Sequence, residues 1–415
     1  MSFRPLAHTV PDQVRDSAEA LRTVLALPCV RPVAAASLVA RLPKGMVPLA
    51  TVLLLHQITG SYAIAGITAA LVAVGDAAST PVQGRLVDRL GRGWVLIPTA
   101  AVHVASVAAV LILTRDGAPT GAVVTCACAA GIGMPPVSGS IKAVWPQLAG
   151  QDHLPAAYTV ESLLQQLVFL SGPLLVAVLT AASGPATALA CSAALVAVGT
   201  VSFVAAAARA APAREMRNQR VHGAWRVPTV QTLACSTGLQ SMAFGALPVG
   251  LAAVTAAAGL PNLAGVLLAT LTTGGIIGTL GPMTTAGKQR YVRLVTGFGA
   301  ALIPVAALSA EPSPAALIAT GAALTAAGLF VTPMAAARYV LIEKATTPAH
   351  RTEAFTWLSA AQATGNAAGA ALAGILTSSA GPAIAIGALP IAVGLAALIG
   401  HFRLPAAGAM TSADR

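Results

Sequence analysis

Residues 84–93 read GRLVDRLGRG, a short polar break between two long apolar runs at residues 61–83 and 94–114. Each run is long enough to cross about 30 Å of hydrocarbon as a helix that rises 1.5 Å per residue. The break holds three arginines and one aspartate, so it has to lie in water or among lipid headgroups. The stretch therefore predicts a hairpin of two membrane-crossing helices with a tight, charged connection.

The composition of the whole chain agrees with a membrane protein. Hydrophobic residues make up 56% of the 415 residues, charged residues make up 9%, and the mean hydropathy is +0.79. A soluble globular chain carries roughly 25% charged residues. The net charge of +11 is scattered over short polar breaks rather than gathered in one patch, which disfavours a nucleic-acid partner. Most of the surface is therefore expected to face lipid.

Twelve apolar stretches are long enough to span the bilayer, and helices are expected because lipid offers no partner to a free peptide group. The predicted fold is all-α and integral to the membrane. The twelve stretches are residues 33–55, 61–83, 94–114, 120–142, 157–181, 185–207, 228–256, 262–285, 293–310, 314–337, 353–378 and 382–402.

Lysine and arginine occupy alternate breaks between these stretches. The breaks at residues 84–93, 208–227, 286–293 and 338–352 hold three to five basic residues each, whereas the other breaks hold only Arg115. The positive-inside rule then predicts that both termini are cytoplasmic and that the number of spans is even. Residues 1–31 lack the apolar core of a signal peptide, so we expect a multi-pass protein of the inner (plasma) membrane with a cytoplasmic tail.

The chain repeats itself with a shift of 197 residues. Uncommon residues align without gaps, and the aligned pairs are Gly84 with Gly281, Gly131 with Gly328, Pro136 with Pro333, Thr159 with Thr356, Ser162 with Ser359, Gln165 with Gln362, Gly172 with Gly369, and Gly184–Pro185 with Gly381–Pro382. Two halves of six helices with equal topology imply a pseudo-twofold axis along the membrane normal.

The repeat divides the chain into parts, and two related bundles can rock about a central cavity, exposing it first to one side and then to the other. The sequence thus favours a transporter that works by alternating access. The predicted parts are an N-terminal tail at 1–31, a six-helix bundle at 32–207, a cytoplasmic linker at 208–227, a second six-helix bundle at 228–403 and a C-terminal tail at 404–415.

The break at residues 84–93 resembles the loop signature of the major facilitator superfamily, G-x-L-x-D-R-x-G-R-[R/K]. It departs from that pattern only at Gly93, where the family has a basic residue. The resemblance implies a bacterial transporter of the twelve-helix type, with two pseudo-symmetric bundles. It also implies a small-molecule solute, a proton or other coupling ion, and a protein that functions as a monomer.

The same resemblance implies a conformational latch on the cytoplasmic side. Gly84 is expected to let two helices approach closely, and Gly91 to permit the chain reversal. Asp88 is expected to accept hydrogen bonds from a helix N-terminus of the other half, with Arg89 and Arg92 at headgroup level. In the second half, the equivalent loop at 281–293 keeps its glycine and basic residues but has no acid.

Two further features bear on coupling. Gly172–Pro173 is similar to the Gly-Pro of the family's antiporter signature, although Leu174, Leu175 and Val176 follow in place of its glycine pattern. The arginine that many proton-coupled members carry in the fourth span is missing, because residues 120–141 hold no charge. The first feature slightly favours export, and the second argues against a standard proton relay.

Three charged residues, Arg41, Lys44 and Asp76, lie in the first two predicted spans, where a charge near mid-bilayer costs roughly 2.5–3.5 kcal/mol. Arg41 and Asp76 lie about 12–14 Å from the inner ends of their spans, so an ion pair between them is geometrically reasonable. Lys44 has no obvious acid at its depth, and in a cavity it would favour an anionic solute. Two interpretations stay open: a site for substrate or proton coupling, or a structural pair.

Other polar residues are candidates for the cavity. Glu161 lies one turn inside its span near Asp152 and Lys142, as either a cavity residue or a member of an interfacial network. Gln165 and Gln362 occupy equivalent places in the two halves, and the remaining uncharged candidates are Gln240, Asn366 and His103. A lone histidine in an apolar run is more often a hydrogen-bonded core residue than a proton carrier.

The sequence contains no metal-ligand spacing and no G-x-x-x-x-G-K-[ST] phosphate loop, so we expect no metal, no cofactor and no direct use of ATP. The five cysteines form no C-x-x-C pair and are expected to be packing residues. The sequence offers no pairing of a nucleophile with a base, so an enzyme is not favoured. The preferred hypothesis is an exporter of small organic or drug-like compounds by proton antiport. Its rival is a proton-coupled symporter that imports an organic acid or similar metabolite.

Overall fold

The computed structural model describes residues 23–150, 153–210, 224–278, 287–346 and 348–404, and within these ranges the chain is helical. The elements are α2 (Val30–Thr59), α3 (Tyr62–Leu90), α4 (Arg92–Arg115), α5 (Thr120–Ile132), α6 (Val137–Ala149), α7 (Leu154–Ser183), α8 (Pro185–Ala210), η1 (Ala224–Arg226), α9 (Pro228–Ala257), η2 (Pro261–Leu263), α10 (Ala264–Gly278), α11 (Lys288–Leu308), α12 (Pro314–Ala345), α13 (Pro348–Ala380) and α14 (Pro382–Arg403).

A helix lies over each of the twelve predicted spans in the part of the chain that the structure describes, and eleven of them qualify as membrane-crossing. In the described part of the chain, eleven segments are long and apolar enough to cross a membrane, with α5 and α6 counted as one. The twelfth long helix is α13, whose 33 residues include Gln362, Asn366 and several serines and threonines that lower its hydropathy. The step between α5 and α6 follows from Pro135 and Pro136, because proline lacks the N–H that would continue the helix.

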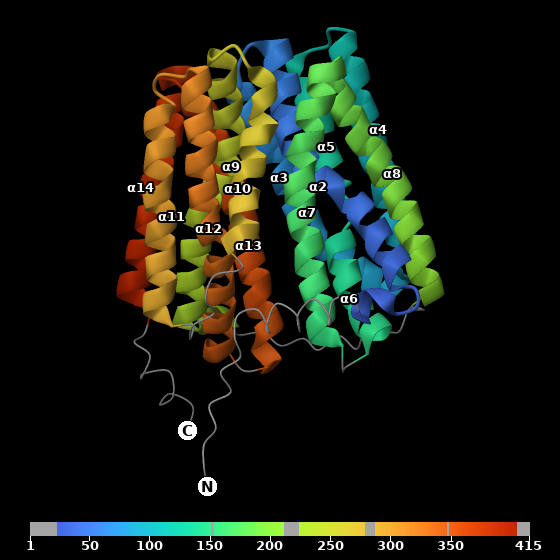
Figure 1. Ribbon diagram of the computed structural model, residues 1–415. Coiled ribbons are helices and arrows are strands. Elements are labelled where there is room, and N and C mark those ends of the chain that lie inside the picture. The colour runs from blue at the N-terminus through green and yellow to red at the C-terminus, as the bar shows by residue number, and fades with distance from the viewer. Residues whose placement is uncertain (1–22, 151–152, 211–223, 279–286, 347, 405–415) are drawn as a thin grey trace.

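Two bundles stand side by side (Figure 1). The first consists of α2–α8 and the second of α9–α14. Within the first, α2 packs against α3, α6, α7 and α8; within the second, α9 packs against α10, α12, α13 and α14. The bundles meet where α3 packs against α13 and α7 against α10, and both α2 and α3 also contact α9. The second helix of each bundle therefore packs against the fifth helix of the other bundle.

The internal repeat predicted from the sequence is present in the backbone. Gly184 precedes α8 with φ +89° and ψ 167°, and Gly381 precedes α14 with φ +91° and ψ 164°. L-residues rarely adopt this region, so the conformation requires glycine. Each glycine is followed by a proline at the first helical position, where the missing N–H costs nothing. The two halves therefore enter their last helix in the same way.

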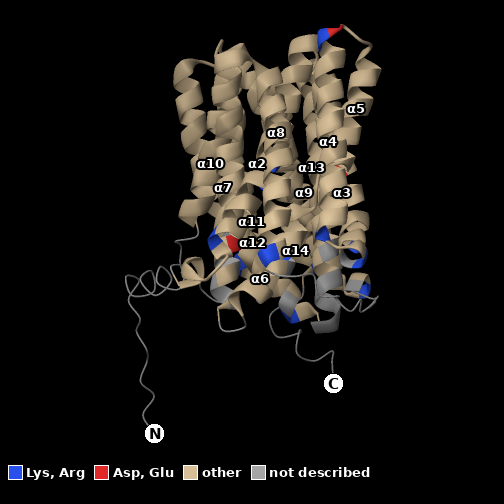
Figure 2. Cartoon of the chain, turned by 90° about the vertical axis from the view of Figure 1, so that its right-hand side faces the viewer, with Lys and Arg blue, Asp and Glu red and all other residues tan. Residues whose placement is uncertain are grey.

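The basic residues gather at one end of the bundle (Figure 2). We name this end, at which α2 begins and α14 ends, the basic face, and the other end the opposite face. Arg115, Asp116 and Glu311 lie at the opposite face among the described residues. The described lysines and arginines near the basic face are Arg31, Arg85, Arg89, Arg92, Lys142, Arg209, Arg226, Lys288, Arg290, Arg293, Lys344 and Arg403.

One predicted break is wrong in extent. The sequence suggested a polar connection at residues 338–352, whereas α12 continues to Ala345 and includes Arg338. The prediction ended the helix at its first basic residue. Arg338 is 8% exposed, because neighbouring helices enclose its side chain. It is therefore a buried charge and not part of a loop.

Close contacts between the bundles concentrate toward the opposite face. A Cβ at Gly66 of α3 would lie 2.5 Å from Ala370 O and 2.9 Å from Gly374 Cα of α13. Nearby, the Tyr62 hydroxyl donates to Ala252 O at 3.2 Å, and the Ala63 N–H donates to Ser378 Oγ at 2.8 Å. Glycine lets the two backbones approach within reach of these bonds. At the opposite face, the bundles are closed against each other.

We predict that Gly66→Leu opens this closure. The new side chain has no space beside Ala370 and Gly374, so the conformation with the opposite face closed becomes unfavourable. Thr377 lies one turn further along α13 and is 8% exposed. In a Thr377→Cys background, we expect Gly66→Leu to raise alkylation by a membrane-impermeant maleimide at least about fivefold, roughly 1 kcal/mol of population shift.

The matched control is Gly121→Leu, at the start of α5 near the same face. A Cβ at Gly121 meets nothing within 4 Å, so this variant should label like the parent. Equal labelling of the Gly66→Leu and Gly121→Leu variants would show that the glycine contact does not hold the two bundles together.

Candidate functional site

A buried ion pair joins α2 to α7. Arg41 Nη1 donates to Glu161 Oε1 at 2.5 Å, and the two side chains are only 1% and 6% exposed. The Ser37 carbonyl accepts from Arg41 Nε at 3.1 Å, and Trp145 Nε1 donates to Glu161 Oε2 at 3.2 Å. Both carboxylate oxygens and most of the guanidinium are thereby satisfied, as a buried pair requires. This network fixes the first bundle rather than offering an open charge.

A second ion pair joins α2 to α3 and is more accessible. Lys44 Nζ lies 3.2 Å from Asp76 Oδ2 and 3.5 Å from Oδ1. Thr80 Oγ1 donates to Asp76 Oδ1 at 3.4 Å. The lysine and aspartate side chains are 23% and 31% exposed. Since α2 and α3 both contact α9, the pair lies on two of the helices that border the second bundle.

The predicted pairing of Arg41 with Asp76 is wrong, and Lys44 does have an acid at its depth. Lys44 lies fourteen residues after Val30, and Asp76 lies fourteen residues before Leu90, so the two are level on antiparallel helices. Arg41 is three residues before Lys44 and therefore about 60° around the helix, where it faces α7. Sequence reasoning gave the depths but not the direction in which each side chain points.

Glu161 is a member of a network, although not the one that its sequence neighbours suggested. Its carboxylate is 4% exposed and turned toward Arg41 and Trp145. Lys142 is exposed, and Asp152 lies outside the described residues. Trp145 was missed, because nothing in the sequence marks an indole N–H as the partner of a distant carboxylate.

The paired glutamines lie at different depths in the packing. Gln165 is half-buried and Gln362 is exposed on α13. The neighbouring Gln166 makes the contact between bundles: its Nε2 donates to Thr332 Oγ1 at 3.0 Å, and Thr332 in turn donates to Gly275 O at 2.9 Å. Gln166 lies twelve residues inside α7, so this bond joins the bundles near mid-depth.

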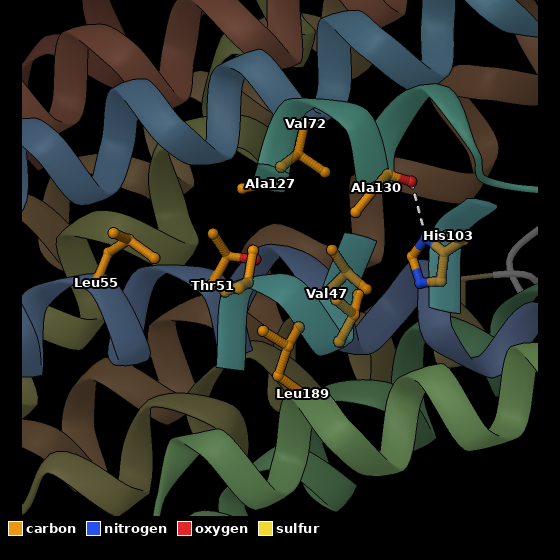
Figure 3. Close-up of a pocket in the computed structure, with 10 residues that line it drawn as sticks. Val47, Thr51, Leu55, Val72, His103, Ala127, Ala130 and Leu189 are labelled. Carbon is orange, nitrogen blue, oxygen red and sulfur yellow. Dashed lines mark hydrogen bonds between the residues drawn. The ribbon is translucent and has the colours of Figure 1, made fainter. Parts of the chain in front are cut away.

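His103 is a core residue in the first bundle (Figure 3). Its Nδ1 lies 2.7 Å from Ala130 O, so that nitrogen carries the proton and donates it. The ring borders a cavity of about 10 Å³, at the lower limit for one water molecule. Apart from His103 and Thr51, the lining is apolar. This environment favours the hydrogen-bonded core interpretation over a proton carrier.

The resemblance motif lies at the joint between α3 and α4, and the polar break predicted at 84–93 is mostly helical: residues 84–90 form the end of α3, and α4 begins at Arg92. Gly91 has φ +89°, so the reversal needs glycine, as expected. A Cβ at Gly84 would meet nothing within 4 Å, so the close approach expected there is not made in this conformation. Arg89 is exposed and Arg92 is half-buried, and the side chain of Asp88 lies outside the described set.

Gly172 and Pro173 mark the point where α7 touches two helices. A Cβ at Gly172 would lie 2.7 Å from Gly45 Cα of α2, and one at Gly265 of α10 would lie 2.1 Å from Pro173 O. The dipeptide therefore has a packing role at the junction of the two bundles. This contact explains the residue types without reference to the direction of transport.

We predict that the Arg41–Glu161 pair contributes to stability as a unit. Glu161→Leu leaves a buried guanidinium without its carboxylate and should lower the free energy of unfolding by about 3–5 kcal/mol. Replacing both residues, as Arg41→Met with Glu161→Leu, should restore most of that loss. The measurement is the temperature at which the purified protein loses its monodisperse elution peak.

Lys44→Met with Asp76→Leu is the comparison pair, because its side chains retain contact with solvent. Its single variants should cost less than those of the buried pair. The interpretation fails if Glu161→Leu melts within error of the parent, or if the double variant is as unstable as the sum of its singles.

Comparison with known proteins comes from the sequence and from the fold. The sequence model of the family described as the Major Facilitator Superfamily matches residues 33–325. A search of curated protein sequences found no match.

Solved structures with the same fold are transporters by their descriptions. A bacterial homologue of the iron transporter ferroportin, in an inward-facing state, has a TM-score of 0.68 at 16% identity, over 89% of this chain and 97% of that one. The nucleoside transporter NupG (D323A mutant) has a TM-score of 0.71 at 12% identity, over 90% and 100%. An autoinhibited POT family peptide transporter has 0.69 at 13%, over 91% and 98%. Together with the family match over most of its length, the two pseudo-symmetric bundles identify this chain as a member of the major facilitator superfamily, a membrane transporter.

Proposed function

We propose that this protein exports small organic or drug-like compounds in exchange for protons, by alternating access, and that Asp76 is the proton-coupling residue. The observation that carries the proposal is the Lys44–Asp76 pair, which is partly exposed at mid-depth on two of the helices that border the second bundle. A charge pair at that depth is costly, so it needs a function or full burial. Arg41 and Glu161 are fully buried, whereas Lys44 and Asp76 are not.

The coupling step is a competition for one carboxylate. When a proton binds an oxygen of Asp76, the ammonium of Lys44 loses its counter-ion and the pair separates. When the proton leaves, the pair forms again. Thr80 Oγ1 donates to the backbone carbonyl of Asp76 at 2.7 Å and lies 3.4 Å from Oδ1, so it remains beside the carboxyl group. Proton release and pairing thus alternate with solute binding in the same cleft, as antiport requires. Gln165, Gln362 and Glu161 contribute to the cleft or its supporting network in this scheme.

We further propose that the structure corresponds to the inward-facing state of a monomer in the inner (plasma) membrane, with the basic face in the cytoplasm. The placement of basic residues at one face follows the positive-inside rule. Among the described residues, the hydrogen bonds between bundles lie near the opposite face or at mid-depth. The side closed in this state is then the extracellular one.

The loop at residues 84–92 acts as the cytoplasmic latch of the other state. In the present conformation Gly84 touches no neighbouring helix and Arg89 is exposed, as expected for an open latch. On closure, Gly84 would approach the second bundle, Asp88 would cap a helix N-terminus there, and Arg89 and Arg92 would anchor the loop beside Gly91 at the headgroups.

A symporter that imports an organic acid is the second candidate. The observation that favours it is Arg338, a buried guanidinium with no carboxylate partner among the described side chains. Flux into and out of proteoliposomes, under an imposed pH gradient and over a panel of compounds, separates the two candidates. If every accepted solute enters together with protons, the export proposal is wrong.

We predict that Asp76→Asn abolishes coupling but not exchange. The amide cannot bind a proton at this position, so flux driven by the pH gradient should fall at least about tenfold, or 1.4 kcal/mol in the driven step. Exchange of labelled for unlabelled solute without a gradient should persist. The matched control is Asp116→Asn, the same change on an exposed residue at the opposite face. Intact gradient-driven flux in Asp76→Asn would remove Asp76 from the coupling role.

We predict that Asp88→Asn slows turnover by several-fold with near-normal insertion. The neutral amide loses the attraction of a carboxylate to the helix dipole, about 0.3–1 kcal/mol, so the state with the cytoplasmic side closed is less populated. Initial flux rates, normalised to the amount of protein inserted, provide the measurement. Asp116→Asn again serves as the control, and an Asp88→Asn variant with the parent's rate would rule out the latch.

A further inference from the structure

Arg338 is a buried charge in the second bundle, and it belongs to neither of the two ion pairs of the first bundle. It lies seven residues before the end of α12 and is 8% exposed. Its Nη1 donates to Thr237 Oγ1 of α9 at 3.1 Å, and its guanidinium lies 5.5 Å from the centre of the Tyr339 ring. The two ion pairs found among the described side chains do not include it.

Polar atoms around Arg338 keep unused hydrogen-bonding capacity. Its own Nε is buried and has no partner among the described atoms, and the same holds for Gln240 Oε1. Gln240 Nε2 donates to Ser236 Oγ at 2.9 Å and to Tyr291 Oη at 2.8 Å, which fixes the orientation of the amide. A buried donor on a charged group that makes no hydrogen bond is expensive. Such a donor points to a ligand that binds to it.

The internal repeat allows the surroundings of Arg338 to be compared with the Arg41–Glu161 pair of the first bundle. A shift of 197 residues moves Arg41 onto Gly238, next to Thr237, the residue that Arg338 contacts. Arg338 reaches the neighbouring residue, Thr237, from α12, whereas a side chain at position 238 would face Ala361 of α13. The same shift moves Glu161 onto Leu358, which is 3% exposed. The second bundle therefore has glycine and leucine at the two positions of the ion pair, and its buried cation comes from a different helix.

We propose that Arg338, with Thr237, binds the anionic group of the transported solute, an oxyanion such as a carboxylate. The solute then supplies the charge that Glu161 supplies in the first bundle. A guanidinium is suited to this role because its planar N–H groups match a carboxylate in two-point geometry. This proposal rests on the proposed transport function and adds the substrate class to it: organic anions.

The experiment measures thermal stability of the purified full-length protein in neutral detergent, with benzoate as the probe and benzamide as its uncharged counterpart at equal ionic strength. A ligand of the native state stabilises it in proportion to ln(1 + [L]/Kd). We expect millimolar benzoate to raise the melting temperature by at least about 2 °C and benzamide to leave it unchanged. Arg338→Gln should lose the benzoate shift, and Arg338→Lys should retain part of it.

Two further variants keep the test valid if Arg338→Gln does not fold. Thr237→Val retains the arginine and removes its hydroxyl partner, so the benzoate shift should shrink. Arg115→Gln, an exposed arginine at the opposite face, should keep the full shift. The proposal is overturned if benzoate shifts Arg338→Gln as much as the parent, or if benzoate and benzamide act alike.

Two other arms identify competing anions. Phosphatidylglycerol replaces benzoate in one of them: an Arg338-dependent shift with this lipid, and none with benzoate, would mean a lipid site and would overturn the solute proposal. The second arm measures the benzoate shift in the variants Glu343→Gln and Glu353→Gln. A benzoate shift that arises only in one of these variants would mean that the native chain already neutralises Arg338, which also overturns it.

The assay is independent of transport. If flux measurements refute proton-coupled export but the Arg338-dependent benzoate shift remains, the anion site stands and the proposed function fails. If flux behaves as proposed and the benzoate shift does not depend on Arg338, only the anion site fails.

Discussion

A charge inside a hydrocarbon layer costs several kilocalories per mole unless a partner or water accompanies it. This chain has few charges, and that cost explains where each of them lies. The basic residues lie near the face where α2 begins and α14 ends, within reach of water and headgroups. Among the side chains that the structure describes, the charges inside the bundles are a fully enclosed pair at Arg41–Glu161, a partly exposed pair at Lys44–Asp76, and the enclosed cation Arg338. Topology, stability and the candidate site therefore follow from a single physical constraint.

The two bundles touch through glycine because they have no hydrophobic force to hold them together in lipid. Tails of lipid are as apolar as leucine, so close backbone contact and the few hydrogen bonds it permits have to supply the attraction. Gly66 against Gly374, and Gly265 against Pro173, provide such contacts. Contacts of this kind are weak enough to separate and specific enough to form again. An interface built from them suits a protein whose two halves have to part at one face and meet at the other.

The fold could be predicted from the sequence because its determinants are local or periodic. Apolar length gives the spans, and the 197-residue repeat gives the two halves, down to the positive φ of Gly184 and Gly381. The site was predicted less well. Depth along a helix can be counted, but the direction of a side chain around it changes by about 100° per residue, and this is why Arg41 was assigned to Asp76 instead of Glu161. The sequence predicts a loop at Arg338, because nothing in the sequence distinguishes a buried basic residue near the end of a span from an exposed one.

The repeat also gives a reason for the difference between the halves. A duplicated sequence initially encodes two equal bundles, and a symmetric transporter would place similar side chains on both sides of an asymmetric solute. In the first bundle, Glu161 neutralises Arg41, and Lys44–Asp76 forms a separate, more exposed pair. In the second bundle, Leu358 stands at the position equivalent to Glu161, and the buried arginine, Arg338, comes from another helix. In the proposed mechanism, a proton binds the carboxylate of Asp76 in the first bundle and leaves the charge of Arg338 in the second bundle unchanged. In the proposed mechanism the coupling carboxylate and the anion-binding cation belong to different bundles, so a proton gradient alters the affinity for an anion without the proton and the anion competing for the same atoms.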